Sequence, residues 1–235
     1  MSRIPRRRIY LMRHGSVDYF LADGTPVHPH TVPLNAAGQK QADAAGALYA
    51  QCGVRFDKVI VSGLNRTVET ATRVLAAAGQ SLPLHTEPAL EEIRGGKLAD
   101  IPPDEVEAAF LGAFTQGTES QRFLGGESIG ELLDRALPAF EAILRRDDWR
   151  TLLLVLHGGV NRALLARAMT GQRGFFGRLE QLPACINIVD VGRDNDDLIV
   201  RTVNLAPTQW LHQHESATTM EKLLAQYLRL ESQLR

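Results

Sequence analysis

The chain has 235 residues, of which 44% are hydrophobic and 23% are charged, and its formal net charge at pH 7 is −1. This composition is ordinary for a globular protein and provides enough core for one large α/β domain or two small ones. A net charge near zero argues against general binding to nucleic acid or to membrane surfaces, which usually needs a strong positive excess. We therefore expect no nucleic acid and no membrane as partners.

Cysteine content and hydropathy bear on the compartment. Cys52 and Cys185 form neither a C-x-x-C pair nor a disulfide framework, which suits a reducing environment. The only apolar run behind the basic amino terminus covers residues 9–12, which is too short for a signal peptide. No stretch approaches the length of a membrane span. These features predict a cytoplasmic protein.

Apolar runs and helix-start signals alternate along the chain. In chain order the predicted elements are a strand at 8–12, a helix at 36–50 capped by Asn35, a strand at 58–61, a helix at 66–77, a strand at 84–86, helices at 104–114 and 128–146, a strand at 151–156, a helix at 160–169, a strand hairpin at 185–191 and 198–203, and a helix at 216–235. Strands that alternate with helices predict the α/β class. We expect a three-layer sandwich, with a mostly parallel sheet flanked by helices, in a single domain over 1–235.

Three segments stand apart from this alternation. Residues 94–126 are rich in glycine and proline and are expected to form a lid-like insertion. Residues 216–235 form an amphipathic helix whose apolar face packs on the domain or on a second subunit, so a homodimer is possible. Arg6, Arg7 and Arg8 form a local basic cluster, which we expect to be solvated charge ahead of the first strand.

Chemically capable side chains follow the predicted strands. Arg13 and His14 end the first strand, Ser62 ends the second, and His157 ends the fourth. The third strand is followed by two adjacent acids, Glu91 and Glu92, of which one points inward. The carboxyl ends of parallel strands meet at one sheet edge, where α/β proteins bind ligands.

These residue types predict a phosphoryl site. Arg13 and Arg66, the latter at the start of a helix, offer paired donors that match phosphate oxygens. The backbone N–H of Gly158, at the start of the next helix, is a natural phosphate donor. Nearby cations keep a histidine neutral, and a neutral imidazole can attack phosphorus to form phosphohistidine while a carboxylate handles the leaving-group proton. The expected partner is a small phosphorylated metabolite.

The same residues lie in motifs that resemble the histidine phosphatase superfamily, also called phosphoglycerate mutase-like, over roughly residues 9–191. The matching segments, in chain order, are Leu11-Met12-Arg13-His14-Gly15, Leu34-Asn35-Ala36-Ala37-Gly38-Gln39-Lys40-Gln41-Ala42, Ser62-Gly63-Leu64-Asn65-Arg66-Thr67-Val68-Glu69-Thr70-Ala71, Leu90-Glu91-Glu92-Ile93, Gly125-Gly126-Glu127-Ser128 and Val155-Leu156-His157-Gly158-Gly159-Val160. Any one of these motifs is weak evidence, but the full set in this order is specific.

The resemblance implies roles for particular residues. His14 would be the phosphorylated nucleophile, and Glu92, rather than Glu91, the proton donor. Arg13, Arg66 and His157 would bind the phosphate. It also implies no metal and no organic cofactor. The long substrate-binding segments of the glycolytic mutases are not recognisable, which favours a phosphatase over a cofactor-dependent phosphoglycerate mutase-type phosphotransferase.

Other readings of the sequence compete with this one. Gly126-Glu127-Ser128-Ile129-Gly130 matches the G-x-S-x-G pattern of serine esterases, but no convincing strand precedes Ser128, which suits a helix cap better. The pairs His28/His30 and His212/His214 could bind metal but have no accompanying acid or cysteine cluster. A non-catalytic phospho-ligand binding domain would keep the fold without the chemistry. The substrate and the role of His28 and His30 are not predicted.

Overall fold

Six strands form one sheet in the computed structural model, which describes residues 6–21, 25–194, 196–211 and 216–234. The strands are β1 (Arg7–Arg13), β2 (Lys58–Val61), β3 (Leu84–Thr86), β4 (Thr151–Leu156), β5 (Ile186–Val191) and β6 (Leu198–Leu205). Their order across the sheet is β3-β2-β4-β1-β5-β6. The first four strands pair in parallel, and the β5–β6 hairpin adds antiparallel strands beside β1. The expected α/β fold with a mostly parallel sheet is confirmed.

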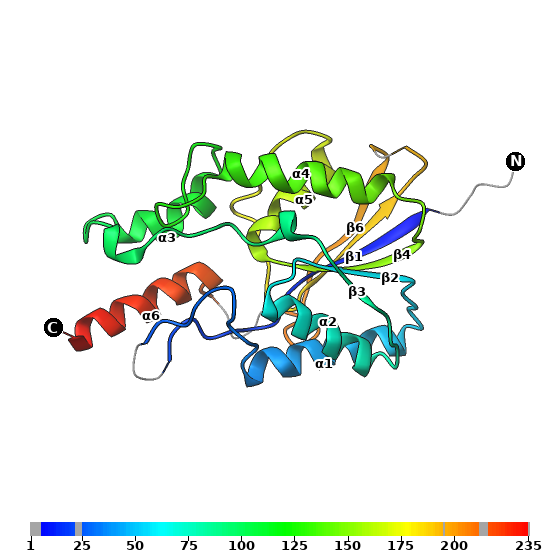
Figure 1. Cartoon of the computed structure of the whole chain (residues 1–235), viewed down its shortest axis with the longest axis horizontal. Coiled ribbons are helices and arrows are strands. Elements are labelled where there is room, and N and C mark those ends of the chain that lie inside the picture. Colours follow the sequence, from blue (N-terminus) through cyan, green and yellow to red (C-terminus); the bar gives the residue numbers. More distant parts are fainter. Residues whose placement is uncertain (1–5, 22–24, 195, 212–215, 235) are drawn as a thin grey trace, which may run out of the picture.

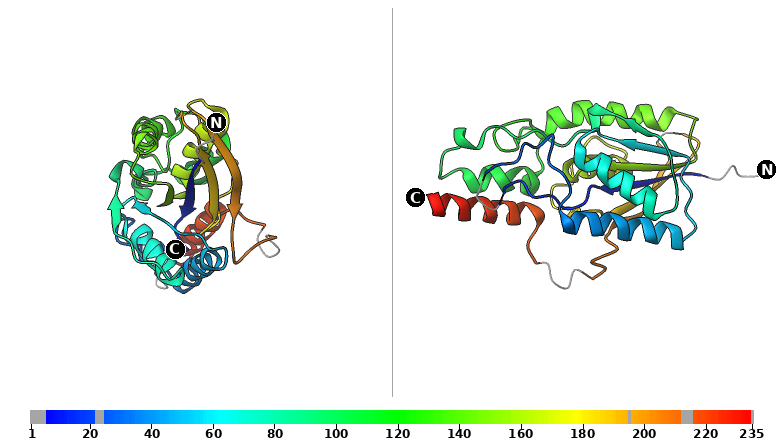
Figure 2. Two further views of the ribbon diagram at one scale, coloured as in Figure 1. Left: turned by 90° about the vertical axis from the view of Figure 1, so that its right-hand side faces the viewer. Right: turned by 60° about the horizontal axis from the view of Figure 1, so that its bottom comes forward.

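Helices cover both faces of this sheet, as Figures 1 and 2 show. One face carries α1 (Ala36–Gln51) and α2 (Asn65–Ala77), and the other carries α4 (Ile129–Arg145) and α5 (Gly158–Thr170). The elements α3 (Val106–Gln116) and α6 (Thr219–Leu234) lie beyond the carboxyl end of β1 (Figure 1). Two single turns, η1 (Pro88–Leu90) and η2 (Leu98–Asp100), complete the set.

The parallel strands are apolar on both faces because helices cover both. Successive side chains of a strand point to opposite faces, so Ile9 and Leu11 of β1 join the core under α4 and α5. Tyr10 and Met12 of the same strand join the core over α1 and α2. Strand β4 divides its side chains in the same way. This double burial fixes the register of the central strands and therefore the position of their ends.

Close backbone approach holds the loop after β1 against α1. A Cβ on Gly15 would lie 2.5 Å from the carbonyl oxygen of Gly38, and a Cβ on Gly38 would lie 2.1 Å from that of Ser16. Only glycine permits this contact. The Asn35 side chain caps α1 by accepting from Gly38 N, as expected. The start of α1 therefore supports the segment that follows His14.

The 94–126 segment and the C-terminal helix pack on each other. One small cluster buries side chains from both segments. It contains Val106 and Phe110 of α3, Leu124 of the loop that follows, and Leu224 of α6. The amphipathic face of α6 is thus covered by this same chain, at the end of the molecule shown on the left of Figure 1. Both helices begin later than expected, at Val106 and Thr219, and β6 continues to Leu205. Among the described residues no helix is long and apolar enough to cross a membrane.

Candidate active site

The pairing of β1 with β4 places the two strand-end histidines side by side. Arg13 is the register partner of Leu156, so His14 and His157 occupy the next position along the sheet edge. The N–H of His14 donates to Leu156 O over 2.9 Å, and the two imidazole centroids lie 5.3 Å apart. Both side chains are buried. Two histidines separated by more than 140 residues of sequence therefore share one pocket.

The ring of His14 is oriented with one nitrogen available for chemistry. Its Nδ1 lies 2.7 Å from the carbonyl oxygen of Gly15, which can only accept, so Nδ1 carries the proton. The lone pair is then on Nε2, which accepts from Nε of Arg66 over 3.2 Å. Arg66 itself is buried, and its other end donates to the Pro29 carbonyl. A guanidinium thus lies directly against the nitrogen that would act as nucleophile.

The ring of His157 is held by a hydroxyl group at the end of β2. Its Nε2 lies 2.8 Å from the hydroxyl of Ser62 at the end of β2, and that hydroxyl also lies 3.0 Å from Thr67 Oγ1. Its Nδ1 is buried and has no hydrogen-bond partner among the described residues. Ser62 therefore orients the ring and leaves one ring nitrogen for another group.

Arg13 presents a second unpartnered atom. Its Nη1 donates to the Gln181 carbonyl over 2.5 Å and to Thr219 Oγ1 over 3.0 Å, which leaves Nε buried without a partner in the described chain. A Cβ built on Gly158 would lie 3.5 Å from that Nε. The start of α5, the Arg13 guanidinium and the two imidazoles thus converge on one small region.

Burial and positive charge keep both imidazoles neutral. Desolvation is the main cause that lowers the pKa of His14 well below its usual value, and the charges of Arg66 and Arg13 lower it further. Desolvation likewise lowers the pKa of His157, followed by the charge of Arg66 and by His14. Protonating either ring would place another cation among arginines in a site that excludes water. Neutral histidine is the form that can attack an electrophile.

The side chain of Glu92 contacts the first turn of α5. Its two carboxylate oxygens accept from the N–H of Gly159 over 3.0 and 3.1 Å, and Oε1 also accepts from the N–H of Ile93. A Cβ on Gly159 would lie 2.5 Å from Oε1, so a larger residue there would push the Glu92 carboxylate out of this position. The segment follows η1 rather than β3 directly. The helix-start donor at Gly159 is thus occupied by a carboxylate, and none of the described hydrogen bonds uses the N–H of Gly158.

Arg135 on α4 holds the segment that carries Glu92, which the sequence did not reveal. Its guanidinium donates to the carbonyls of Ala89, Glu91 and Glu92 over 2.7–3.0 Å. It also pairs with Glu127 at 2.7 Å. Burial alone would raise the pKa of Glu127, but the hydrogen bonds from Arg135 and from the N–H of Arg94 lower it. Glu127 and Arg135 are eight residues apart, one in a loop and one in a helix, so no periodic sequence pattern predicts their ion pair. The only sequence signal was that Glu127 lies in one of the family-like motifs.

A second missed group connects the C-terminal helix to the site. Thr219, the first residue of α6, accepts from Arg13 and donates to Glu180 Oε1 over 2.9 Å. Glu180 in turn pairs with Arg162 at 3.4 Å. Arg162 lies on α5, where burial lowers its pKa to about 10. This chain of polar contacts joins α6 to α5 through the pocket wall.

Other candidate residues lie apart from these groups. Ser128 caps α4 in a reciprocal capping box with Glu131, so its hydroxyl accepts from the helix N–H rather than facing a histidine. The rings of His28 and His30 are exposed with centroids 5.4 Å apart. No cluster of three or more His, Cys, Asp or Glu able to hold a metal occurs in the part of the chain that the structure describes. His212 and His214 lie outside that part.

Comparison with known proteins agrees with this geometry. The sequence model of the histidine phosphatase superfamily (branch 1) matches residues 9–204. A protein of Salmonella paratyphi A named "Probable phosphoglycerate mutase GpmB" is 32% identical over 154 residues, which cover 64% of this chain and 69% of the relative.

Solved structures show the same fold. An alpha-ribazole phosphatase from Shigella flexneri superposes with a TM-score of 0.65 at 23% identity, covering 84% of this chain and 96% of that one. A mycobacterial glucosyl-3-phosphoglycerate phosphatase superposes with a TM-score of 0.62 at 21% identity, covering 84% and 98%. The family match spans most of the sequence and includes every residue of the pocket's strand ends. The chain belongs to the histidine phosphatase superfamily, branch 1.

Proposed function

We propose that the chain is a metal-independent phosphatase that hydrolyses a small phosphomonoester through a phosphohistidine on His14. One observation carries the proposal. Two buried polar atoms of the residues around His14 have no partner in the described chain: Nδ1 of His157, whose ring centroid lies 5.3 Å from that of His14, and Nε of Arg13, the residue before His14. Buried polar groups are normally hydrogen-bonded, so unpaired ones beside a nucleophile indicate the position of a ligand's oxygens.

A phosphoryl group would satisfy these atoms. Arg13, Arg66 and the N–H of Gly158 donate to its oxygens, and Arg66 exchanges its bond to His14 for a bond to phosphate. His157 donates from Nδ1 when that nitrogen carries the proton, and Nε2 then accepts from the hydroxyl of Ser62. These donors neutralise the charge on phosphorus and stabilise it as it grows during transfer.

The reaction then proceeds in two steps. The Nε2 lone pair of His14 forms a bond to phosphorus as the bond to the ester oxygen breaks, and Glu92, which enters this step protonated, gives that oxygen its proton. A water molecule next attacks phosphorus, gives a proton to the Glu92 carboxylate, and the P–N bond breaks with its electrons returning to Nε2. The position of Glu92 at the first turn of α5 places it one residue from the donor at Gly158. Uncatalysed hydrolysis of phosphate monoesters is among the slowest reactions known, so division into two steps lowers a very high barrier.

The test is phosphate release from p-nitrophenyl phosphate in the presence of EDTA. We expect turnover in the wild type, loss by at least about a thousandfold in His14→Asn, and a labelled protein band after acid-free quenching of a ³²P-labelled ester. Exposed His85 provides a matched control, and His85→Asn should retain activity. Turnover that survives His14→Asn, or that requires a metal, would contradict the proposal.

A mutase-type phosphotransferase is the second candidate, because the curated relative carries that name. The same phosphohistidine would then pass its phosphoryl group to a second hydroxyl instead of water. Supplying 3-phosphoglycerate with catalytic 2,3-bisphosphoglycerate distinguishes the two, since a mutase accumulates the isomer and a phosphatase accumulates free phosphate.

Binding without either product would instead favour a non-catalytic phospho-ligand domain. Labelling of Ser128 by a serine-directed phosphonate would support an esterase.

A further inference from the structure

The opposite end of the sheet carries a second concentration of arginines. Strand β1 runs from Arg7 to the active-site residues, so its amino end lies about 20 Å from His14 at the usual rise of roughly 3.3 Å per residue. A cavity of about 640 Å³ opens there between the starts of β1 and β4 and the loop after α1. Four of its nine lining residues are arginines, Arg6, Arg8, Arg55 and Arg150, and none is acidic.

A second hollow of about 510 Å³ continues this surface. It shares Arg6 and Arg150 with the first cavity, and it adds Arg7, Arg145, Arg146 and Arg193 against one lining acid, Asp147. The chain as a whole has a net charge of −1, so this concentration is local. The basic cluster at residues 6–8, expected from the sequence to be solvated charge, is thus part of a concave surface.

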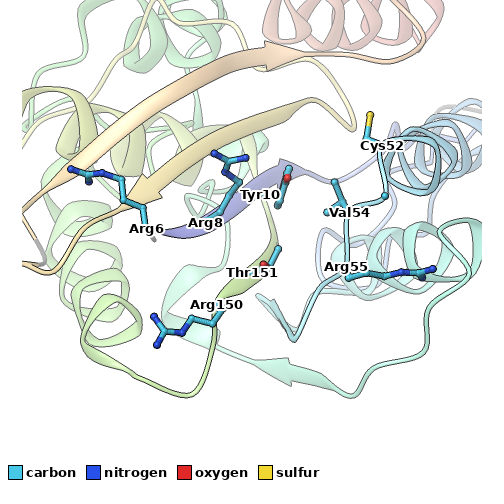
Figure 3. A pocket seen from close by; sticks show the side chains of 9 residues that line it. Arg6, Arg8, Tyr10, Cys52, Val54, Arg55, Arg150 and Thr151 are labelled. Atoms are coloured by element: carbon cyan, nitrogen blue, oxygen red, sulfur yellow. The ribbon is translucent and has the colours of Figure 1, made fainter. Parts of the chain in front are cut away.

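Only some of these arginines have carboxylate partners. Arg6 pairs with Asp197 at 2.7 Å and Arg8 with Asp190 at 2.6 Å. The side chains of Arg55 and Arg150 have neither an ion pair nor a hydrogen bond among the described residues, and both are exposed. Figure 3 shows Arg55 beside Val54 and Arg150 beside Thr151, on different sides of the cavity and with their side chains extending away from each other, while Arg6 and Arg8 lie together at the start of β1. Two arginines without a carboxylate partner in the described chain therefore lie near two that have one.

Like charges also lie close together here. Desolvation lowers the pKa of Arg7, and the charge of Arg150 lowers it further. Arg7 donates to the carbonyls of Leu144 and Arg146 and lies over the ring of Trp149, and the charge of Asp147 offsets only part of the effect of Arg150. Neighbouring uncompensated guanidinium groups repel each other unless an anion lies between them. A bound anion would relieve this repulsion.

We propose that this cavity, which we call the distal arginine pocket, binds a small molecule that carries a di- or triphosphate chain. Guanidinium groups bind phosphate oxygens in pairs, and cations on several sides suit a ligand with more than one charged centre. The hydroxyls of Tyr10 and Thr151 line the same cavity and add polar contacts. A volume of several hundred Å³ suits a nucleotide-sized ligand, and the concave shape favours a small molecule over an extended polyanion.

The test uses a methylene-bridged triphosphate, whose P–C–P links resist hydrolysis, with inorganic phosphate at equal ionic strength for comparison. Isothermal titration calorimetry should show binding to the wild type at a site that survives Arg66→Gln. In the double variant Arg55→Gln/Arg150→Gln we expect affinity to fall at least about tenfold. The control Arg122→Gln/Arg178→Gln removes the same charge from exposed arginines elsewhere and should bind as the wild type does.

Cys52 provides a readout that needs no variant. It is exposed and lines the distal arginine pocket, whereas the other cysteine, Cys185, is buried. Alkylation by N-ethylmaleimide should therefore modify Cys52 alone, and bound triphosphate should slow it at least about threefold. The protection should disappear in Arg55→Gln/Arg150→Gln.

Three results would overturn the proposal. Binding that disappears in Arg66→Gln, without protection of Cys52, would place the ligand in the active site. If the affinity for the triphosphate fell equally in Arg55→Gln/Arg150→Gln and in the control Arg122→Gln/Arg178→Gln, the binding would be non-specific electrostatic attraction. Failure of the triphosphate to bind would overturn it as well, and capture of RNA or of anionic lipid vesicles that depends on Arg55 and Arg150 would then assign the surface to a macromolecule. None of these readouts depends on phosphatase activity, so this proposal and the proposed function can fail separately.

Discussion

Each buried histidine of the pocket has one nitrogen fixed by a neighbour. Gly15 O fixes Nδ1 of His14, and Ser62 fixes Nε2 of His157. This arrangement turns the two rings in different directions, so that His14 offers a lone pair while His157 offers its remaining nitrogen. The same residue type can therefore serve as nucleophile at one strand end and as phosphate ligand at the next.

We expect the hydroxyl of Ser62 to position His157, and this role can be tested directly. In Ser62→Ala we expect kcat/KM to fall about tenfold, because His157 loses the partner that orients its ring. The inhibition constant for inorganic phosphate should rise in parallel, because the same ring would bind the free ion. Steady-state kinetics with phosphate as inhibitor checks both.

A purely structural role for Ser62 would give a different pattern. It would lower the melting temperature and leave the inhibition constant of the folded enzyme unchanged. Ser81→Ala, at an exposed position, is the matched control and should alter neither quantity. An unchanged inhibition constant in Ser62→Ala would remove Ser62 from the site.

Among the elements, α4 supports the segment that carries Glu92, the proposed acid. Arg135 links this helix to three carbonyls around Glu92 and to the carboxylate of Glu127. Both partners of the ion pair are mostly buried, with 16% and 9% of their side chains exposed. Removal of one member leaves a buried charge and several carbonyls unpaired, which costs far more than loss of a surface ion pair.

We therefore expect Arg135→Gln to lower the free energy of unfolding by about 2–3 kcal/mol and to lower kcat roughly tenfold. Arg122→Gln removes a similar arginine that pairs with Glu131 at an exposed position, and it should cost at most about 1 kcal/mol. Urea denaturation and steady-state kinetics measure the two effects. If Arg135→Gln lost stability but kept the wild-type kcat in its folded fraction, Arg135 would have no part in placing Glu92.

The strand ends could be predicted from sequence because they follow from local pattern. An apolar run that stops at Arg13-His14 or at His157-Gly158 indicates a buried strand and its carboxyl end, and parallel pairing then brings the ends together. The structure places these side chains within one pocket for that reason.

The supporting contacts could not be predicted in this way. Arg135 reaches its carbonyls, and Thr219 reaches Arg13, only through the packing of elements remote in sequence. The occupied N–H of Gly159 was missed for the same reason, since the partner carboxylate comes from 67 residues earlier in the chain. Such contacts depend on how helices α4, α5 and α6 dock, which a single sequence does not specify.

At the scale of the whole molecule, the sheet separates two basic regions. The carboxyl end of β1 and β4 carries Arg13 with the histidines, and the amino end of the same strands carries Arg8 and Arg150. The apolar core formed by the strands lies between the two regions, so their charged groups are not in contact with each other. Acidic residues elsewhere bring the total to −1. Salt should therefore weaken anion binding at both ends while leaving the core intact.

The buried neutral histidines also couple stability to pH. The folded-state pKa values of His14 and His157 lie well below 6.5, whereas the unfolded chain binds protons at these histidines near pH 6.5. Below pH 6.5 the unfolded state therefore binds more protons than the folded state, so acidification favours unfolding. The free energy of unfolding rises as pH increases through 6.5, and the contribution of these two groups levels off at about pH 7.5, where the unfolded histidines are neutral as well.

We expect His157→Asn to reduce the slope of unfolding free energy against pH by about 1.4 kcal/mol per pH unit between pH 5 and 6, because one such group is removed. Urea denaturation at intervals from pH 5 to 7.5 measures the slope, which is independent of any constant stability change caused by the substitution. His85→Asn removes an exposed histidine and should leave the slope as in the wild type. A wild-type slope in His157→Asn would mean that His157 is protonated in the folded protein, and the electrostatic reason for a neutral histidine pair beside Arg13 and Arg66 would then fail.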